Sequence, residues 1–177
     1  MTRPDDDLAR PYHLWASGFT RRWHMNAALS RVDDLVCAHQ GRCAVLVMAL
    51  FPWHSLALLR AAVTHDAAEF VVGDLSAPFK KRGGGLVGDH AEIEAEMLAG
   101  MGLAQVLDAT QIRYLKLVDR IDSCLFVDLY APHEARRNGW PELKNWCVQE
   151  AFNLECGNAV SGLFWDSEAG AHEEALT

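Results

Sequence analysis

The adjacent pair His65-Asp66 has the residue types best suited to chemistry in this sequence. His39 lies one expected helix upstream of the pair, and Asp119 lies on an expected helix downstream. Imidazole nitrogens and carboxylate oxygens together form a ligand set that suits a borderline or hard divalent metal such as Zn, Mn, Co or Fe. We therefore expect these four side chains to converge from three helices on one cation.

The same residue types also have a purely structural interpretation. A lone histidine on an apolar helix usually bonds a backbone carbonyl, and this is our interpretation of His54. His90 and Glu94 stand four apart and form a rival pair, but no third ligand is evident, so we interpret them as a solvated face. For the main set, burying two imidazoles and two carboxylates without compensation would be costly, whereas a shared metal satisfies all four. The metal site is therefore the favoured interpretation.

Composition and charge limit the class of protein. A chain of 177 residues, half of them apolar, fits a single domain with a sizeable core. The formal net charge of −8 argues against a protein that coats nucleic acid, which usually needs a basic face. The basic residues are grouped locally at 21–22, 80–82 and 136–137. Small basic clusters in an acidic protein fit a small anionic ligand better than a polyanion.

The cysteines and the apolar segments predict a cytoplasmic protein with no membrane partner. The five cysteines form an odd set without a Cys-x-x-Cys spacing, which is typical of reduced thiols. The acidic amino terminus lacks the apolar region of a secretory signal. The longest apolar run, residues 44–53, is too short to span a bilayer and contains Pro52.

Apolar residues recur at spacings of three and four, and strand signals are weak, so the sequence predicts an all-α fold. We expect one helical domain over residues 1–177, with a polar, frayed tail after about residue 167. On the expected helices, His65 shares a face with Glu69, and Lys116 shares a face with Asp119. Residues 20–31 are expected to form an ordered loop, and residues 80–85 a basic, glycine-rich one. The expected helices cover residues 12–19, 33 or 34 to about 50, 56 to about 70, 89 to about 99, 110–130 and 141 to roughly 165.

Five short elements follow one another along residues 22–130: Arg22-Trp23, His39, His65-Asp66-Ala-Ala-Glu69, Gly73-Asp74-Leu-x-x-Pro78-x-Lys80 and Lys116-Leu-Val-Asp119. In order and spacing they resemble the HD-domain phosphohydrolases. Within that family, the similar branch contains the YfbR-like 5′-deoxynucleotidases and the phage dATP triphosphohydrolases called DatZ. One departure is Ala38, which stands where the YfbR-like group commonly has a glutamate. This departure argues against a plain monophosphatase.

The resemblance implies an all-helical bundle with the metal in a cleft between helices. Glu69 would be the acid/base residue, and Asp74 would contact or support the 3′-hydroxyl of the substrate. The cation would be Zn, Co or Mn, and a second ion such as Mg at the phosphates stays open. The implied metal ligands are His39, His65, Asp66 and Asp119.

The resemblance also implies how a nucleotide would bind. Arg22 would bind the phosphate under attack, and Trp23 would pack against the sugar and disfavour a 2′-hydroxyl. In the triphosphohydrolase branch, two residues would close on the purine and two lysines would meet the phosphate tail. These four residues are Met25, Pro78, Lys80 and Lys116.

Three functions are open at this point. The leading hypothesis is a metal-dependent hydrolase of deoxynucleoside triphosphates that prefers dATP, attacks the α-phosphorus and releases deoxyadenosine and triphosphate. The alternatives are a 5′-deoxynucleotidase and a catalytically inactive HD-like module that binds nucleotides. Relatives in the resembled branch assemble, so a homo-oligomer (a dimer or a hexamer) is implied.

Overall fold

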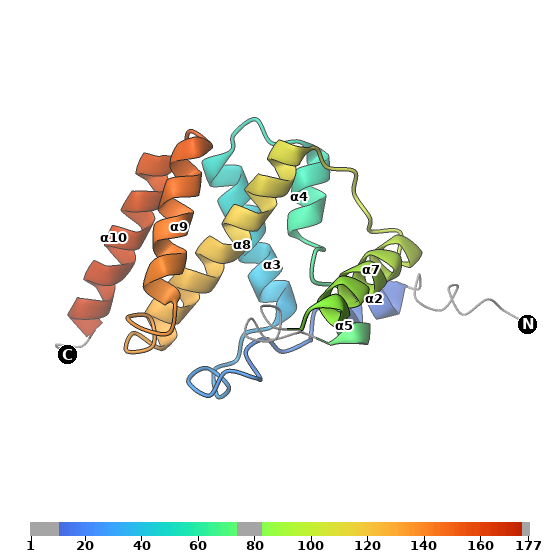
Figure 1. Ribbon diagram of the computed structural model, residues 1–177, viewed down its shortest axis with the longest axis horizontal. Helices are drawn as coiled ribbons and strands as arrows, with labels where there is room; N and C mark the ends of the chain where they lie inside the picture. Colours follow the sequence, from blue (N-terminus) through green and yellow to red (C-terminus); the bar gives the residue numbers. More distant parts are fainter. Residues whose placement is uncertain (1–10, 74–82, 175–177) are drawn as a thin grey trace, which may run out of the picture. The chain divides into compact units, whose positions relative to one another are not determined.

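The chain is all-helical in the computed structural model, which describes residues 11–73 and 83–174. Within those ranges no strand forms, and one isolated antiparallel bridge joins Arg21 and Leu35. The all-α prediction is therefore confirmed. None of the described helices is long and apolar enough to cross a membrane. The helices, labelled as in Figure 1, are α2 (Pro11–Ser17), α3 (Val36–Leu50), α4 (Leu56–Ala62), α5 (Glu69–Val72), α7 (Gly85–Gly100), α8 (Ala109–Tyr130), α9 (Trp140–Asn153) and α10 (Gly157–Glu174).

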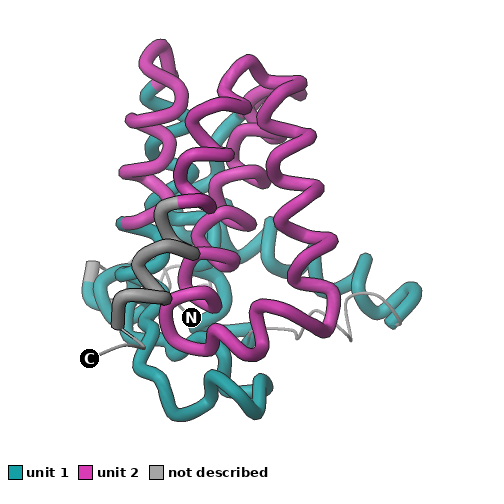
Figure 2. The backbone as a smooth tube through the Cα atoms, turned by 90° about the vertical axis from the view of Figure 1, so that its left-hand side faces the viewer, with its two compact units in different colours: residues 1–41, 56–106 teal, residues 42–55, 107–177 magenta. Residues whose placement is uncertain are grey.

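The chain divides into two compact units (Figure 2). The first contains residues 1–41 and 56–106, and the second contains residues 42–55 and 107–177. Helix α3 begins in the first unit and ends in the second. The single domain expected from the sequence stays a prediction.

In the first unit, α5 packs against α2 and α7. The buried apolar side chains of this unit come from its helices and from its loops, with Leu29, Val36, Leu58 and Met101 among them. The predicted first helix is confirmed by α2, while α7 begins at Gly85, four residues before the expected start. Residues 20–35 form turns, as expected for an ordered loop.

The expected helix over residues 56–70 is wrong, because the chain leaves the helix after Ala62. Residues 63–68 form turns in which the backbone nitrogen of Thr64 donates to the carbonyl of Ala61, three residues back. The Thr64 hydroxyl also donates to the carbonyl of Arg60 at 2.8 Å, a side-chain bond that competes with regular helix. His65 and Asp66 therefore lie in a turn, and His65 does not share a helix face with Glu69.

In the second unit, α8, α9 and α10 pack against one another. The predicted helix over residues 110–130 is confirmed by α8, and its start is fixed by a capping box between Asp108 and Gln111. The inward face of α8 carries Leu117, Ile121 and Cys124, all fully buried at spacings of three and four. His54 donates from Nδ1 to the carbonyl of Phe51 at 2.8 Å, which confirms the structural interpretation of that histidine.

The single helix expected over residues 141–165 is wrong, because α9 and α10 are separated at residues 154–156. Glu155 has a left-handed φ of 64°, and its backbone nitrogen donates to the carbonyl of Phe152. The nitrogen of Cys156 donates to the carbonyl of Ala151 at 2.9 Å. These bonds form the Schellman motif that commonly ends helices. Helix α10 continues to Glu174, and the expected fraying after about residue 167 stays a prediction.

All five cysteines are free thiols, and four of them are buried. This agrees with the prediction of reduced cysteines. Cys124 and Cys147 are hydrogen-bonded to each other inside the second unit, and this bond and burial raise the pKa of Cys124 far above its ordinary value.

Candidate metal centre

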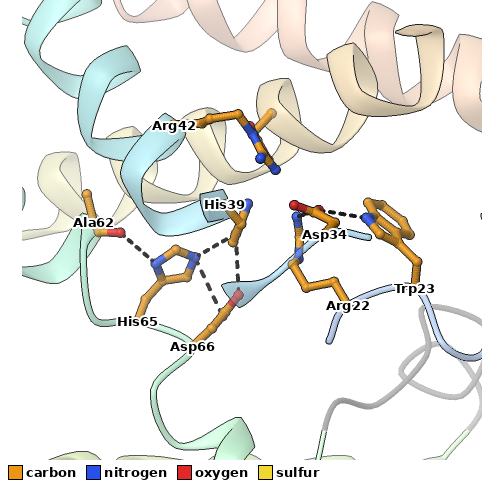
Figure 3. A network of polar contacts seen from close by, with 9 residues as sticks. Arg22, Trp23, Asp34, His39, Arg42, Ala62, His65 and Asp66 are labelled. Atoms are coloured by element: carbon orange, nitrogen blue, oxygen red, sulfur yellow. Dashed lines mark hydrogen bonds and ion pairs between the residues drawn. The ribbon is translucent and has the colours of Figure 1, made fainter. Parts of the chain in front are cut away.

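Three of the four expected metal ligands come together in the first unit (Figure 3). His39 is fully buried on α3, and its Nε2 lies 3.2 Å from Nε2 of His65. One carboxylate oxygen of Asp66 lies 3.3 Å from Nε2 of His39, and the other lies 3.5 Å from Nε2 of His65. Helix α3 supplies the first side chain, and the turn after α4 supplies the other two.

The hydrogen bond of His65 determines which of its nitrogens faces the cluster. Its Nδ1 lies 3.1 Å from the carbonyl oxygen of Ala62. Because a carbonyl only accepts, Nδ1 donates to it, and Nε2 is the nitrogen that faces His39 and Asp66. Metal-binding histidines usually have this arrangement, in which the outer nitrogen donates to a backbone carbonyl and orients the ring. The His65 ring is therefore oriented as a ligand would be.

Asp66 carries a negative charge in this cluster. Burial alone would raise the pKa of its carboxyl, but the charge of His65, the hydrogen bond and charge of His39, and the charge of Arg22 together hold that pKa well below its ordinary value. An ionised carboxylate beside two imidazole nitrogens is the donor set that a divalent cation requires. The three residues therefore fit a metal ion.

The turn that carries the His-Asp pair is also held from α3. The side-chain amide of Gln40 donates to the carbonyl of Val63 at 3.0 Å, and its oxygen accepts from the backbone nitrogen of Asp66 at 3.3 Å. Gln40 follows His39 directly, so consecutive residues of one helix contact the turn. Nothing in the sequence indicated a role for this residue, because a glutamine carries no chemical signal by itself.

Cys43 is a further donor that the sequence analysis did not identify. It lies four residues after His39 on the same helix, α3, and it is fully buried. A thiol at this spacing is a second possible donor on the helix that carries His39. The spacing of four residues between a histidine and a cysteine on one expected helix was a signal for it.

Arg22 and Trp23 share a buried acceptor, the carboxylate of Asp34. Its Oδ2 accepts from Nη1 of Arg22 at 3.1 Å and from Nε1 of Trp23 at 2.9 Å (Figure 3). The side chain of Asp34 is fully buried, and that of Arg22 is 12% exposed. The guanidinium also lies 4.9 Å from the centroid of the Trp23 ring. No signal in the sequence indicated that Asp34 belongs to the site, since its partners precede it by 11 and 12 residues.

The remaining expected site residues lie elsewhere or outside the described ranges. Glu69 is buried at the first position of α5. Met25 is 70% exposed in the loop before α3. Lys116 and Asp119 lie on α8 in the second unit, so their roles stay predictions. Outside the described residues lie Asp74, Pro78 and Lys80.

His90 and Glu94 form the contact expected of a pair one turn apart. Nδ1 of His90 lies 3.5 Å from a carboxylate oxygen of Glu94, while Nε2 lies 3.2 Å from the carbonyl oxygen of Gly73. Both ring nitrogens are thus engaged with the protein itself. In the described part of the chain, this pair does not belong to a group that could hold a metal.

No family model matches this chain, and neither a curated protein nor a solved structure matches it. The resemblance to the HD-domain phosphohydrolases, and with it the cleft between helices, therefore stays a prediction from the five sequence elements. The cluster of two imidazoles and one carboxylate does not depend on that resemblance, because it is a feature of the structure itself.

Proposed function

We propose that this protein is a metal-dependent phosphohydrolase of deoxynucleotides, with dATP as the preferred substrate, cleaved at the α-phosphorus to deoxyadenosine and triphosphate. The observation that carries this proposal is the meeting of His39, His65 and Asp66 at contact distance, with the charge of Arg22 acting on the same carboxylate. Two imidazole nitrogens and a carboxylate oxygen suit a divalent cation, and a neighbouring guanidinium suits a phosphate.

Each described residue has a definite task in this proposal. The cation would be held by His39, His65 and Asp66, with Asp119 as the fourth ligand predicted from the sequence. A divalent cation there supplies polarisation of a phosphoryl oxygen and a lowered pKa for its water. Arg22 would bind the phosphate and stabilise the charge that develops on it. Because phosphoryl transfer depends mainly on positioning and charge, no covalent nucleophile is needed.

The proton chemistry and the sugar selection would come from two other side chains. Glu69 is buried only three residues after Asp66, where it would take or give a proton during hydrolysis. The indole of Trp23 would pack against the deoxyribose and leave no room for a 2′-hydroxyl. These two roles follow from the resemblance and are part of the proposal.

A 5′-deoxynucleotidase is the second candidate, and one observation favours it. Among the described lysines and arginines, Arg22 is the one whose charge lowers the pKa of Asp66. A single guanidinium is enough to bind one phosphate. A triphosphate tail would need the lysines of the sequence hypothesis, Lys80 and Lys116, in addition.

A nucleotide screen tests the proposal. The purified protein is incubated with each common deoxynucleotide and ribonucleotide, as mono- and triphosphate, in the presence of Co, Mn, Mg or Zn, and the products are separated by chromatography. Tripolyphosphate released from dATP is the expected result. Orthophosphate released directly from dAMP would support the second candidate instead. Nucleotide binding without turnover would indicate the inactive module. The absence of both binding and turnover would contradict the proposal.

A matched pair of variants connects any activity to this site. His65→Ala removes one nitrogen from the cluster, while His90→Ala removes a histidine that is engaged with Glu94 and Gly73. The first should abolish turnover, and the second should leave it unchanged. Equal activity in both variants would place the chemistry elsewhere.

A further inference from the structure

We infer that Asp34 is a positioning residue, whose buried carboxylate fixes the guanidinium of Arg22 and the indole of Trp23 as one phosphate- and sugar-binding element. This inference rests on the proposed function for the roles of Arg22 and Trp23. The positions of the two side chains, by contrast, are features of the structure. We assign Asp34 no direct contact with the substrate, so it acts through its two partners.

A single oxygen couples the two side chains. Oδ2 of Asp34 accepts from Nη1 of Arg22 and from Nε1 of Trp23, at 3.1 and 2.9 Å. Hydrogen bonds to an ionised acceptor are stronger than neutral ones, and both donors here bond to a carboxylate that is fully buried. Because the two donors share one acceptor atom, displacement of the carboxylate would move both side chains.

The backbone holds the same two segments together. The nitrogen of Arg22 donates to the carbonyl of Asp34 at 2.9 Å, and the nitrogen of Val36 donates to the carbonyl of Thr20 at 2.9 Å. These bonds flank the bridge between Arg21 and Leu35. Residue 34 is thus attached to residue 22 by main chain and side chain at once, immediately before α3 begins.

Trp23 has an uncommon backbone conformation, which indicates that the surrounding structure fixes the orientation of its side chain. Its φ of 63° lies in the left-handed region, which is costly for a residue with a bulky side chain. Such conformations persist where the surroundings over-determine them, and they cluster at binding sites. The hydrogen bond from the indole to Asp34 is one interaction that holds this conformation. A tryptophan that only filled space would not need it.

The guanidinium of Arg22 also contacts the indole that shares its acceptor. It bonds Asp34 at 3.1 Å and lies 4.9 Å from the centroid of the Trp23 ring. Because the indole bonds the same carboxylate, Asp34 holds the arginine both directly and through Trp23. Asp34 therefore does more than an ordinary ion-pair partner, which adds stability alone.

The preceding residue provides a matched control. Asp33 pairs with Arg21 at 2.6 Å, but both side chains are mostly exposed, at 72% and 65%. An exposed pair of this kind contributes little. Asp33→Asn and Asp34→Asn therefore make the same chemical change one residue apart, once on the surface and once in the buried network.

The first measurement does not depend on activity. In a ¹H–¹⁵N correlation spectrum, the indole signal of Trp23 is identified by its loss in Trp23→Phe. We expect Asp34→Asn to shift this signal, because the indole loses an ionised acceptor, and we expect Asp33→Asn to leave it in place. An unshifted Trp23 signal in Asp34→Asn would overturn the inference, whatever the protein hydrolyses.

The second measurement is the selectivity for deoxyribose, taken as the ratio of kcat/KM for dATP to that for ATP. A loss of stability alone would lower both rates together and leave the ratio unchanged. In Asp34→Asn we expect kcat/KM for dATP to fall about 10- to 100-fold and the ratio to fall with it, since small misplacements of binding groups have effects of this size. In Asp34→Glu, which keeps the charge, part of the rate should return. An unchanged ratio in both variants would overturn the inference.

The two measurements separate this inference from the proposed function. If the wild-type protein hydrolyses no nucleotide, the proposed function fails, and the Trp23 signal still decides whether Asp34 positions the indole. If Asp34→Asn does not fold, as judged by circular dichroism, the same spectra are recorded for Asp34→Glu. A shifted Trp23 signal in that variant supports the inference, and an unshifted one contradicts it.

Discussion

Nε2 of His39 and Nε2 of His65 lie 3.2 Å apart, although 26 residues separate them in the chain. A hydrogen bond over this distance needs a proton on one of the two Nε2 atoms. We expect that proton on Nε2 of His39, since Nδ1 of His65 already donates to the carbonyl of Ala62. A metal that binds both Nε2 atoms must displace this proton.

Metal binding is thus expected to release a proton and to weaken as the pH falls, because the cation and the proton compete for His39. Calorimetric titration with Co or Zn at one pH, in two buffers of different ionisation enthalpy, measures the release directly. The observed binding enthalpies should differ between the buffers. Identical enthalpies would show that no proton leaves, and the assignment of the His39 proton would be wrong.

Asp119→Ala should abolish both metal binding and turnover while the protein keeps its helical circular dichroism spectrum. The sequence predicts this carboxylate as the fourth ligand, and it lies half-buried on α8. Metal content after dialysis, measured by atomic emission, gives the first result, and the nucleotide assay gives the second. Full metal content in Asp119→Ala would remove this residue from the ligand set.

Arg42→Ala should lower the free energy of unfolding by about 2 kcal/mol, measured by urea denaturation. Its Nε and Nη2 bond the two carboxylate oxygens of Asp122 at 2.5 and 3.1 Å, and Asp122 is buried. Arg113→Ala is the matched control, since it removes an exposed arginine that bonds Glu150 at 2.7 Å. That variant should lose clearly less stability, because an exposed ion pair contributes little. Equal losses would mean that burial of the carboxylate does not matter.

The pair of Arg113 and Glu150 should make stability depend on pH. The hydrogen bond from Arg113, more than any other contact, lowers the pKa of Glu150 below its ordinary value. A lowered pKa in the folded state stabilises the protein above the unfolded pKa of about 4.3, and this contribution is lost as the pH falls through the folded value. Wild-type protein should therefore exceed Glu150→Gln in urea midpoint at pH 7, and the difference should shrink toward pH 3. A difference that grows on acidification would contradict the sign.

Glu155→Gly should be more stable than Glu155→Ala by about 1 kcal/mol, because a left-handed residue with a Cβ is strained and glycine is not. Glu155 has a φ of 64° between α9 and α10. Thermal unfolding of the two variants measures the difference. The reverse order would mean that the left-handed turn is not retained in the variants.

The parts of the fold that the sequence predicted well are those where side chains alone specify the helix. Helix α8 has fully buried Leu117 and Ile121 at a spacing of four and a Pro two residues after its end, and its predicted bounds are nearly correct. The division between α9 and α10 was missed because Glu155 occupies the left-handed position where glycine is the usual signal. The end of α4 was missed because Thr64 bonds the backbone there.

The site could be predicted only in part, and for a related reason. Histidine and aspartate indicate metal binding by their type, so His39, His65 and Asp66 could be selected before any fold was known. Asp34 could not be selected, because its task depends on a loop that brings Arg22 and Trp23 back to it. Gln40 was missed for the same reason, since its partners belong to the turn at residues 63–66.

The shared oxygen of Asp34 has a consequence for how this protein evolves. Because Arg22 and Trp23 share one acceptor atom, a mutation at position 34 changes the environment of both, and replacement of either partner alters the acceptor of the other. Natural selection would then act on positions 22, 23 and 34 as a single inherited trait, whose members are gained and lost together.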